Sequence, residues 1–174
     1  MKYAFIYGGL GGAIAVGIIS ATLALDLPNH TTSVWFGYLV MLAALSLIFV
    51  GVKRYRDVEC GGVIRFWRAF GLGVGTAAVA GLFYAVGWEI FIAASGYDFI
   101  ADYSAGIADG MRADGAAPAA IEATLAEMRD MAEMYYNPLI RVPMIFAEIL
   151  PVGLLVALVS AALLRNPRLL PAAR

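Results

Sequence analysis

Cysteine, histidine and charged residues are scarce in this chain of 174 residues. Cys60 is the single cysteine and His30 the single histidine. One thiol excludes a disulfide within the chain and a thiolate metal cluster, and one imidazole argues against a histidine metal cluster and a His-based triad. Charged side chains make up 14% of the residues, against about 25% in a typical soluble domain. We therefore expect no bound metal, no cofactor and no catalytic machinery built from these groups.

Apolar residues are in large excess, at 62% of the chain with a mean hydropathy of +0.81. A soluble domain usually carries about 45–50%. Most of the excess lies in four long runs, and about 20 apolar residues are enough for a helix to cross a bilayer. The sequence therefore predicts one all-α membrane domain, residues 1–174, built as a bundle of four transmembrane helices with spans at about 3–25, 34–52, 69–94 and 142–164.

The first run has a second interpretation, as a cleaved signal peptide. Lys2 precedes it, and Thr22-Leu23-Ala24 resembles a cleavage site. The apolar stretch is longer than the roughly 7–15 residues of the apolar h-region of a signal peptide, and it contains a glycine-rich face. A retained helix is the preferred interpretation.

Basic residues are unevenly distributed between the spans. The segment after residue 52 and the C-terminal tail are basic, whereas residues 95–141 carry eight acidic residues against three arginines. Because Lys and Arg near helix ends favour the cytoplasm, both termini and the middle loop are expected to be cytoplasmic. The first loop, with a turn expected at Asp26-Leu27-Pro28-Asn29 and a helix cap within Thr31–Ser33, would then lie outside. The basic residues are Lys53, Arg54, Arg56, Arg65, Arg68, Arg165, Arg168 and Arg174.

Glycines spaced four residues apart mark the first and third spans. The pairs Gly8–Gly12 and Gly71–Gly75, and the series Gly73, Ala77 and Gly81, allow helix backbones to approach closely, which is a main source of packing energy in lipid. We expect these two helices to make the tightest contact, either within one chain or across a dimer. The glycines from Gly71 to Gly75 do not indicate a nucleotide site, because they lie inside an apolar helix with no strand before them.

A helical hairpin is predicted at about residues 97–136, on the extracytoplasmic side. Ser95 and Asp98 match a capping box, and Asp114-Gly115 and Pro118 mark a helix end and a helix start. Apolar residues then recur at helical intervals in both halves. This stripe requires burial against the helix ends, the other half of the hairpin, lipid headgroups or another protein. Its members include Ile107, Met111, Ile121, Leu125, Met128, Met131 and Tyr135.

Two acidic residues, Glu89 and Glu148, lie inside the predicted spans. A charge at the centre of a bilayer costs roughly 2.5–3.5 kcal/mol, so an intramembrane carboxylate is a functional candidate. The helical rise places Arg141 near the depth of Glu89, with Glu148 deeper. We predict a Glu89–Arg141 ion pair and a deeper Glu148. Structural roles are the alternative, because Glu148 could donate a hydrogen bond to a carbonyl freed by Pro143 or Pro151, and Glu89 could reach the headgroups.

Several stretches together resemble a bacterial membrane-protein family catalogued as domain of unknown function 4199. They are Lys53-Arg54-Tyr55-Arg56-Asp57, Ile64-Arg65-Phe66-Trp67-Arg68-Ala69-Phe70, Tyr84 before Trp88-Glu89, and Glu148-Ile149-Leu150-Pro151-Val152-Gly153-Leu154. The resemblance covers nearly the whole chain. It implies four membrane helices with an extracytoplasmic insertion and a bacterial inner-membrane location, and it implies no activity and no site residues.

Two functions follow from these observations as hypotheses. The first is a non-enzymatic multi-pass membrane protein with a structural, assembly or interaction role. Its partners would be the lipid bilayer and, through the hairpin, a second copy or another membrane protein, with no nucleic acid. The alternative is a small proton- or ion-linked transporter or channel using Glu89 and Glu148. A membrane-embedded enzyme ranks last because no nucleophile, metal or cofactor motif is recognisable.

Overall fold

The computed structural model describes residues 1–25 and 34–172, which form seven α-helices and no strand. The turn expected at 26–29, the cap expected at 31–33 and His30 lie outside the described residues. The helices are α1 (Lys2–Ala24), α2 (Val34–Leu45), α3 (Leu47–Glu59), α4 (Phe66–Ser95), α5 (Phe99–Ala113), α6 (Pro118–Tyr135) and α7 (Pro138–Leu164).

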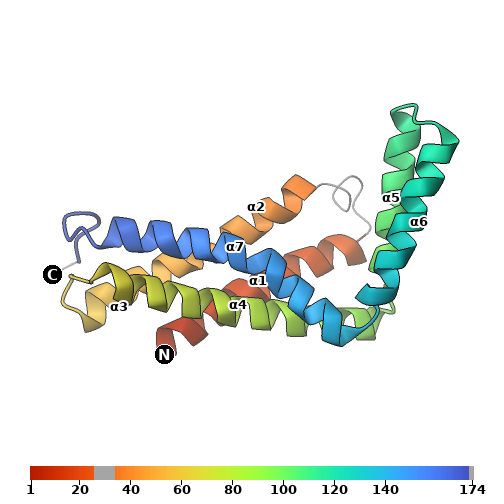
Figure 1. The fold of residues 1–174 in the computed structure, drawn as a ribbon. Coiled ribbons are helices and arrows are strands. Elements are labelled where there is room, and N and C mark those ends of the chain that lie inside the picture. The colour runs from red at the N-terminus through yellow and green to blue at the C-terminus, as the bar shows by residue number, and fades with distance from the viewer. Residues whose placement is uncertain (26–33, 173–174) are drawn as a thin grey trace.

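Four spans are long and apolar enough to cross a membrane: α1, the α2–α3 unit, α4 and α7. They run alternately up and down and lie side by side as a bundle (Figure 1). The start of α1, the turn between α3 and α4 and the end of α7 lie at one end of the bundle. The α5–α6 pair lies at the other end. This arrangement agrees with the four apolar runs of the sequence.

The second span is longer than its apolar run and is broken once. The helix continues to Glu59 rather than ending at residue 52, as the loss of apolar residues had suggested, because backbone hydrogen bonding does not require apolar side chains. At Ser46, the side chain donates to the Ala43 carbonyl at 2.6 Å. Such back-bonding often bends a helix. The α2–α3 unit is therefore long enough to cross a membrane as one span, with a break at Ser46.

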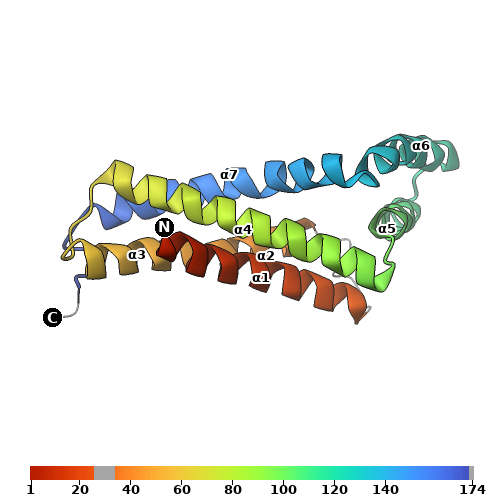
Figure 2. The same ribbon diagram turned by 90° about the horizontal axis from the view of Figure 1, so that it is seen from below.

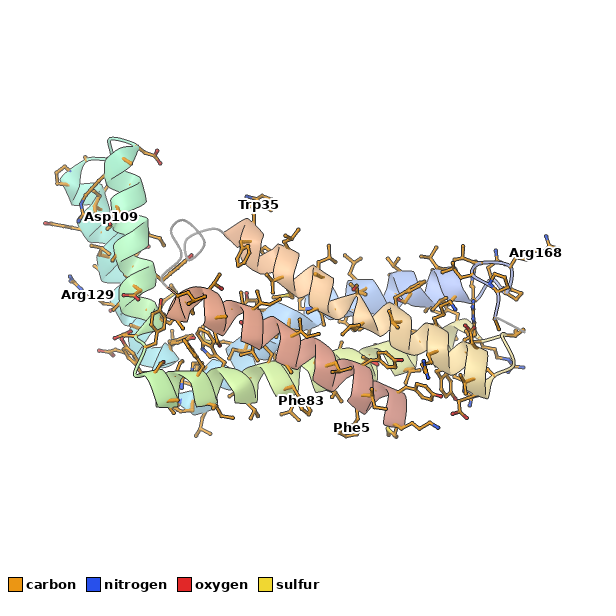
Figure 3. The ribbon with its side chains drawn as sticks, turned by 180° about the vertical axis from the view of Figure 1, so that it is seen from behind. Phe5, Trp35, Phe83, Asp109, Arg129 and Arg168 are labelled. Carbon is orange, nitrogen blue, oxygen red and sulfur yellow. The ribbon has the colours of Figure 1, made fainter. Side chains whose placement is uncertain are left out.

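Large apolar side chains face outward and small residues fill the interior of the bundle. Phe5 is 59% and Phe83 45% exposed, and both lie at the outer surface of the bundle (Figure 3). Ala77 and Ala157 are fully buried. A water-soluble monomer rarely exposes apolar area on this scale, whereas a bundle in lipid packs through small residues. The side-chain distribution is the one expected for a bilayer as solvent.

Helices α1 and α4 meet at glycines. A Cβ added to Gly8 would lie 2.5 Å from the Thr76 carbonyl oxygen, and one added to Gly12 would clash with the Ala80 carbonyl oxygen. Both obstacles are backbone atoms, which cannot rotate away as a side chain can. The predicted close approach through Gly8 and Gly12 is therefore present within one chain.

The role predicted for Gly71 is wrong for contacts within the chain. A Cβ on Gly71 would meet nothing within 4 Å, and one on Gly75 would only touch Ala4 at 3.9 Å. The helical phase turns Gly71 to the outside and Gly73 to the inside. A Cβ on Gly73 would lie 2.7 Å from that of Ala157, and α4 packs on α7 as extensively as on α1. Helix α4 is therefore the centre of the bundle.

The α5–α6 pair begins and ends at the signals read from the sequence, with one correction. Asp98 alone caps α5, accepting from Ala101 N at 3.1 Å, while the Ser95 hydroxyl donates to Phe91 O within the last turn of α4. Helix α5 ends before Gly115, whose φ is +75°, and α6 starts at Pro118. A left-handed residue and an N-terminal proline are common at these two positions.

The apolar stripe of α6 is buried mainly against α5. Ile121 and Met128 are buried on α6, as is Ala108 on α5, whereas Met131 is 52% exposed. In Figures 1 and 2 the pair lies across the end of the bundle, with its axis roughly perpendicular to the spans. If the spans follow the membrane normal, these two helices lie parallel to the membrane surface.

Candidate functional site

Glu89 of α4 and Arg141 of α7 form a two-pronged ion pair. Arg141 Nε donates to Glu89 Oε1, and Arg141 Nη2 to Glu89 Oε2, both at 2.6 Å. The Arg141 side chain is 7% exposed and that of Glu89 29%. Parallel, charge-assisted bonds of this kind fix two groups in both distance and orientation. The structure thus brings together the two residues that helical depth had placed side by side.

The position of Arg141 is set by the start of α7. Asn137 caps this helix, accepting from Leu139 N at 3.0 Å, and the Arg141 backbone N–H bonds to Asn137 O at 2.9 Å. A cation in the first turns of a helix is opposed by the positive end of the helix dipole. The carboxylate of Glu89 compensates for this, and Arg141 Nη1 also donates to the Tyr135 carbonyl at 3.1 Å.

An aromatic cluster lies beside this ion pair and ties α4 to α5 and α6. Trp88 Nε1 donates to the Tyr135 hydroxyl at 2.8 Å. The Phe99 ring packs edge-on to Trp88, with centroids 5.5 Å apart, and lies 5.8 Å from the Tyr135 ring and 5.6 Å from that of Tyr103. The Arg141 guanidinium lies 5.3 Å from the Tyr135 ring centre. These contacts fix the base of the α5–α6 pair on the bundle.

Glu148 is placed differently from Glu89. It follows Arg141 by two turns of α7, which is about 10 Å deeper in the bundle at 1.5 Å per residue. Its side chain is exposed and makes no hydrogen bond or ion pair with any residue that the structure describes. The bond to a proline-freed carbonyl, considered as an alternative, is therefore not formed. The structure separates the three candidates into a paired Glu89–Arg141 and an unpaired Glu148.

Glu148 lines a cavity of about 420 Å³ between the ends of the spans and the α5–α6 pair. Neither Glu89 nor Arg141 is among the described residues of its wall. The wall is mostly aromatic and apolar, with one carboxylate, tyrosine hydroxyls and Thr22. The described lining residues are Ile19, Thr22, Leu23, Phe36, Gly37, Tyr38, Tyr84, Trp88, Phe99, Tyr103, Tyr135, Met144, Ile145 and Glu148.

A smaller cavity of about 50 Å³ continues deeper between α1, α2, α4 and α7. Four of the described residues line both cavities: Ile19, Gly37, Tyr84 and Glu148. A Cβ on Gly37 would meet nothing within 4 Å, so its missing side chain adds to the open space. Glu148 consequently lies where the larger cavity meets the smaller one.

Two tyrosines at the base of α6 titrate abnormally. Burial raises the pKa of the Tyr135 hydroxyl, and the nearby charges of Glu89 and Glu148 add to the rise, while the Trp88 hydrogen bond and Arg141 oppose it. The hydrogen bond from the Tyr136 hydroxyl to Asp98, 2.8 Å long, raises the pKa of Tyr136. Both hydroxyls are therefore held in the neutral form.

Arg56 has a structural role that was not predicted from the sequence. Its side chain is fully buried, with Nε bonded to Asp57 Oδ1 at 2.7 Å and Nη1 and Nη2 donating to the carbonyls of Leu169 and Leu170. It thus fastens the C-terminal tail to α3. From the sequence, Arg56 was a topology signal in a solvated turn, with a local pair to Asp57 as the alternative, and the Asp57 pair is the one formed. The bonds to the tail could not be predicted, because the carbonyl partners lie more than a hundred residues away and have no side-chain signature.

No curated protein and no solved structure matches the chain. A family model matches residues 2–166, which is nearly the whole chain, and its description is "Protein of unknown function (DUF4199)". This match agrees with the resemblance carried by the Tyr-Arg-Asp run after the second span and by the segment from Glu148 to Leu154. The chain therefore belongs to the DUF4199 family.

Proposed function

We propose that the protein is a non-enzymatic, multi-pass protein of a bacterial inner membrane. Both termini and the α3–α4 turn are cytoplasmic, and the α5–α6 pair is extracytoplasmic. The distribution of charge supports this orientation. Lys53, Arg54 and Arg65 lie near the α3–α4 turn, at the same end as the tail, whereas residues 95–141 are acidic. Basic flanks of membrane helices remain in the cytoplasm.

Labelling of single cysteines tests this orientation. Cys60 lies beside the α3–α4 turn, and Ala119, at the start of α6, is exposed. A membrane-impermeant maleimide applied to intact spheroplasts should label Ala119→Cys in a Cys60→Ser background and leave native Cys60 unlabelled. Labelling of Cys60 without labelling of Ala119→Cys would reverse the topology. Lysed membranes, in which both thiols should react, are the control.

The function that the geometry supports best is non-covalent binding of a small ligand inside the bundle. The observation that carries this proposal is the cavity of about 420 Å³ with the unpaired carboxylate of Glu148 in its wall. Ligand sites are mostly apolar spaces of about 300–1,000 Å³ with few polar groups that orient the ligand. A carboxylate without a partner inside an apolar span is energetically unfavourable, and such a residue is a candidate for a functional role.

Native mass spectrometry of the protein released from its own membrane tests for such a ligand. Gly37→Phe fills the cavity, and Gly71→Phe is the matched control, since both glycines face open space and only Gly37 lines the cavity. A bound small molecule should remain on the wild type and on Gly71→Phe and be lost from Gly37→Phe. No adduct, or the same adduct on all three proteins, would contradict the proposal.

Ion- or proton-linked transport is the second candidate, and the same unpaired Glu148 favours it. The form proposed from the sequence used both Glu89 and Glu148. Because Arg141 binds Glu89 at both oxygens, only Glu148 is free to exchange an ion. Proton or cation flux into liposomes should then be present for the wild type and lost in Glu148→Gln. The absence of flux in both proteins would exclude transport and leave the binding proposal intact.

A further inference from the structure

We propose that the cavity binds a lipophilic organic cation, an ammonium or phosphonium group on an apolar body, with Glu148 as its counter-ion. This inference rests on the proposed binding function and specifies the ligand class for the same site. It follows from three properties of the described wall: its charge, its aromatic rings and its small number of oxygen ligands.

The charges near the cavity leave one negative group without a partner. Arg141 lies at this end of the bundle, and its guanidinium is already bonded to Glu89 and to the Tyr135 carbonyl. An ionised Glu148 therefore faces the cavity with no counter-charge among the described residues. A ligand that supplies a positive charge at this point removes the energetic penalty of the carboxylate. An anionic ligand increases it.

Aromatic rings surround the same space. Tyr84, Trp88, Phe99, Tyr103 and Tyr135 line the cavity. The centre of the Phe99 ring lies 5.5 Å from that of Trp88 and 5.8 Å from that of Tyr135. The face of an aromatic ring is electronegative and attracts a cation, best of all a weakly hydrated one, by about 0.5–2 kcal/mol. Cages of aromatic side chains beside one carboxylate suit quaternary ammonium groups and similar cations.

The wall suits an organic cation better than a metal ion. Calcium takes six to eight oxygen ligands and magnesium six, at short distances. The described wall presents one carboxylate, the Thr22 hydroxyl and scattered tyrosine hydroxyls among apolar side chains such as Ile19, Leu23, Met144 and Ile145. An organic cation needs only one counter-charge and gains from contact with the apolar wall.

Two ions of the same shape and opposite charge provide the test. Tetraphenylphosphonium and tetraphenylborate are titrated by isothermal calorimetry into the full-length protein in a non-ionic detergent. The variants are Glu148→Gln, Gly37→Phe and, as the matched loss of one carboxylate, Glu127→Gln on the exposed face of α6. Thermal unfolding of each variant shows whether it is folded. Gly37→Phe keeps the test valid if Glu148→Gln does not fold.

We expect the wild type and Glu127→Gln to bind tetraphenylphosphonium with the same affinity, within about twofold. Glu148→Gln should bind it at least about 30-fold more weakly, because the substitution removes one partner of a desolvated charge pair. Gly37→Phe should abolish binding. Tetraphenylborate should bind to none of the proteins.

Other outcomes overturn the inference and separate it from the proposed function. Equal binding of both ions, or binding that Glu148→Gln leaves unchanged, overturns the cation assignment. The binding function stands in that case if Gly37→Phe still abolishes binding. If neither ion binds, the assignment falls, and the binding function falls with it only when native mass spectrometry also shows no adduct.

The positive charge could come from a free solute or from a lipid headgroup. Dihexanoyl-phosphatidylethanolamine carries an ammonium group, and dihexanoyl-phosphatidylglycerol of the same chain length does not. If the first lipid displaces tetraphenylphosphonium and the second does not, the cation is a lipid headgroup. If neither competes, it is a soluble cation. Both results support the proposal, whereas competition by the glycerol lipid alone overturns it.

Discussion

Glu89 and Glu148 are the same kind of side chain in neighbouring membrane helices, and their surroundings differ completely. Glu89 receives two hydrogen bonds of 2.6 Å from Arg141. Glu148 receives none within the described part of the chain and faces a cavity. Pairing lowers the energetic penalty of burying a charge only for Glu89. At the scale of single residues, the partner determines whether an intramembrane carboxylate acts as a structural tie or remains available to a ligand.

The Glu89–Arg141 pair is expected to behave as one unit. Arg141→Ala should lower the free energy of unfolding by about 2–3 kcal/mol, which is below the roughly 3–5 kcal/mol for a fully buried pair because Glu89 is partly exposed. The double variant Glu89→Leu with Arg141→Met should recover most of this loss, since it leaves no unpaired charge. Denaturant unfolding in detergent measures the cycle. A double variant as unstable as Arg141→Ala would contradict the assignment.

Two glycines of the same predicted type should respond differently to a methyl group. Gly12→Ala should lower the free energy of unfolding by about 1–3 kcal/mol, because its Cβ meets the Ala80 carbonyl and Tyr84 N, which are backbone atoms. Gly71→Ala should change it by less than about 0.5 kcal/mol, because its Cβ meets nothing. Thermal unfolding of both variants checks this. Equal losses would mean that Gly71 has a contact outside this chain.

At the scale of elements, the contacts that fix the α5–α6 pair to the bundle lie at its base, within the residues that the structure describes. Helix α5 packs on α6, and the anchoring contacts are those of Trp88, Phe99 and Tyr135 together with the Tyr136–Asp98 hydrogen bond. The rest of the pair extends across the bundle end (Figure 1). Partner docking was one of the interpretations open for the apolar stripe, and on that face Met128 is buried and Leu125 half-buried. Met131 and Met134 are the exposed large apolar residues of α6.

The base of the α5–α6 pair is expected to loosen in alkali. The pKa values of Tyr135 and Tyr136 are raised in the folded protein. Their contribution to stability is therefore complete below the ordinary tyrosine pKa of about 10 and is lost as the pH rises through the folded values. Thermal unfolding midpoints between about pH 8 and pH 12 should fall less steeply in Tyr136→Phe than in the wild type. Identical slopes would contradict the role of the Asp98 bond.

The C-terminal tail is expected to depend on Arg56. Arg56→Ala leaves the carbonyls of Leu169 and Leu170 and one oxygen of Asp57 without their donor, at about 1–3 kcal/mol for a buried unsatisfied group. Protease cleavage in the tail should become faster in this variant. Arg54→Ala is the control, because Arg54 lies in the same basic run and forms no hydrogen bond to the tail within the described part of the chain. Equal rates of cleavage in both variants would contradict the role of Arg56 in holding the tail.

At the scale of the whole molecule, we expect the bundle to insert into a membrane without the α5–α6 pair but to require that pair for ligand binding. Replacement of residues 97–136 by a short Gly-Ser linker should leave the four spans in the membrane, because insertion depends on their length and apolarity. The same deletion removes Phe99, Tyr103 and Tyr135 from the cavity wall and should abolish ligand binding. Membrane fractionation and calorimetry measure the two effects. A deleted chain that stays out of the membrane would contradict this separation.

The sequence alone determined the number and approximate limits of the spans, the signals at both ends of α6, and the depth at which Glu89 meets Arg141. These properties depend on local composition, helical rise and the length required by a bilayer. Only the tertiary structure decided that Gly73 rather than Gly71 faces a neighbour, that Arg56 holds the tail, and that Glu148 opens into a cavity. Those properties depend on how the helices are rotated and paired in space, and four helices with similar apolar surfaces leave that rotation unspecified until they pack.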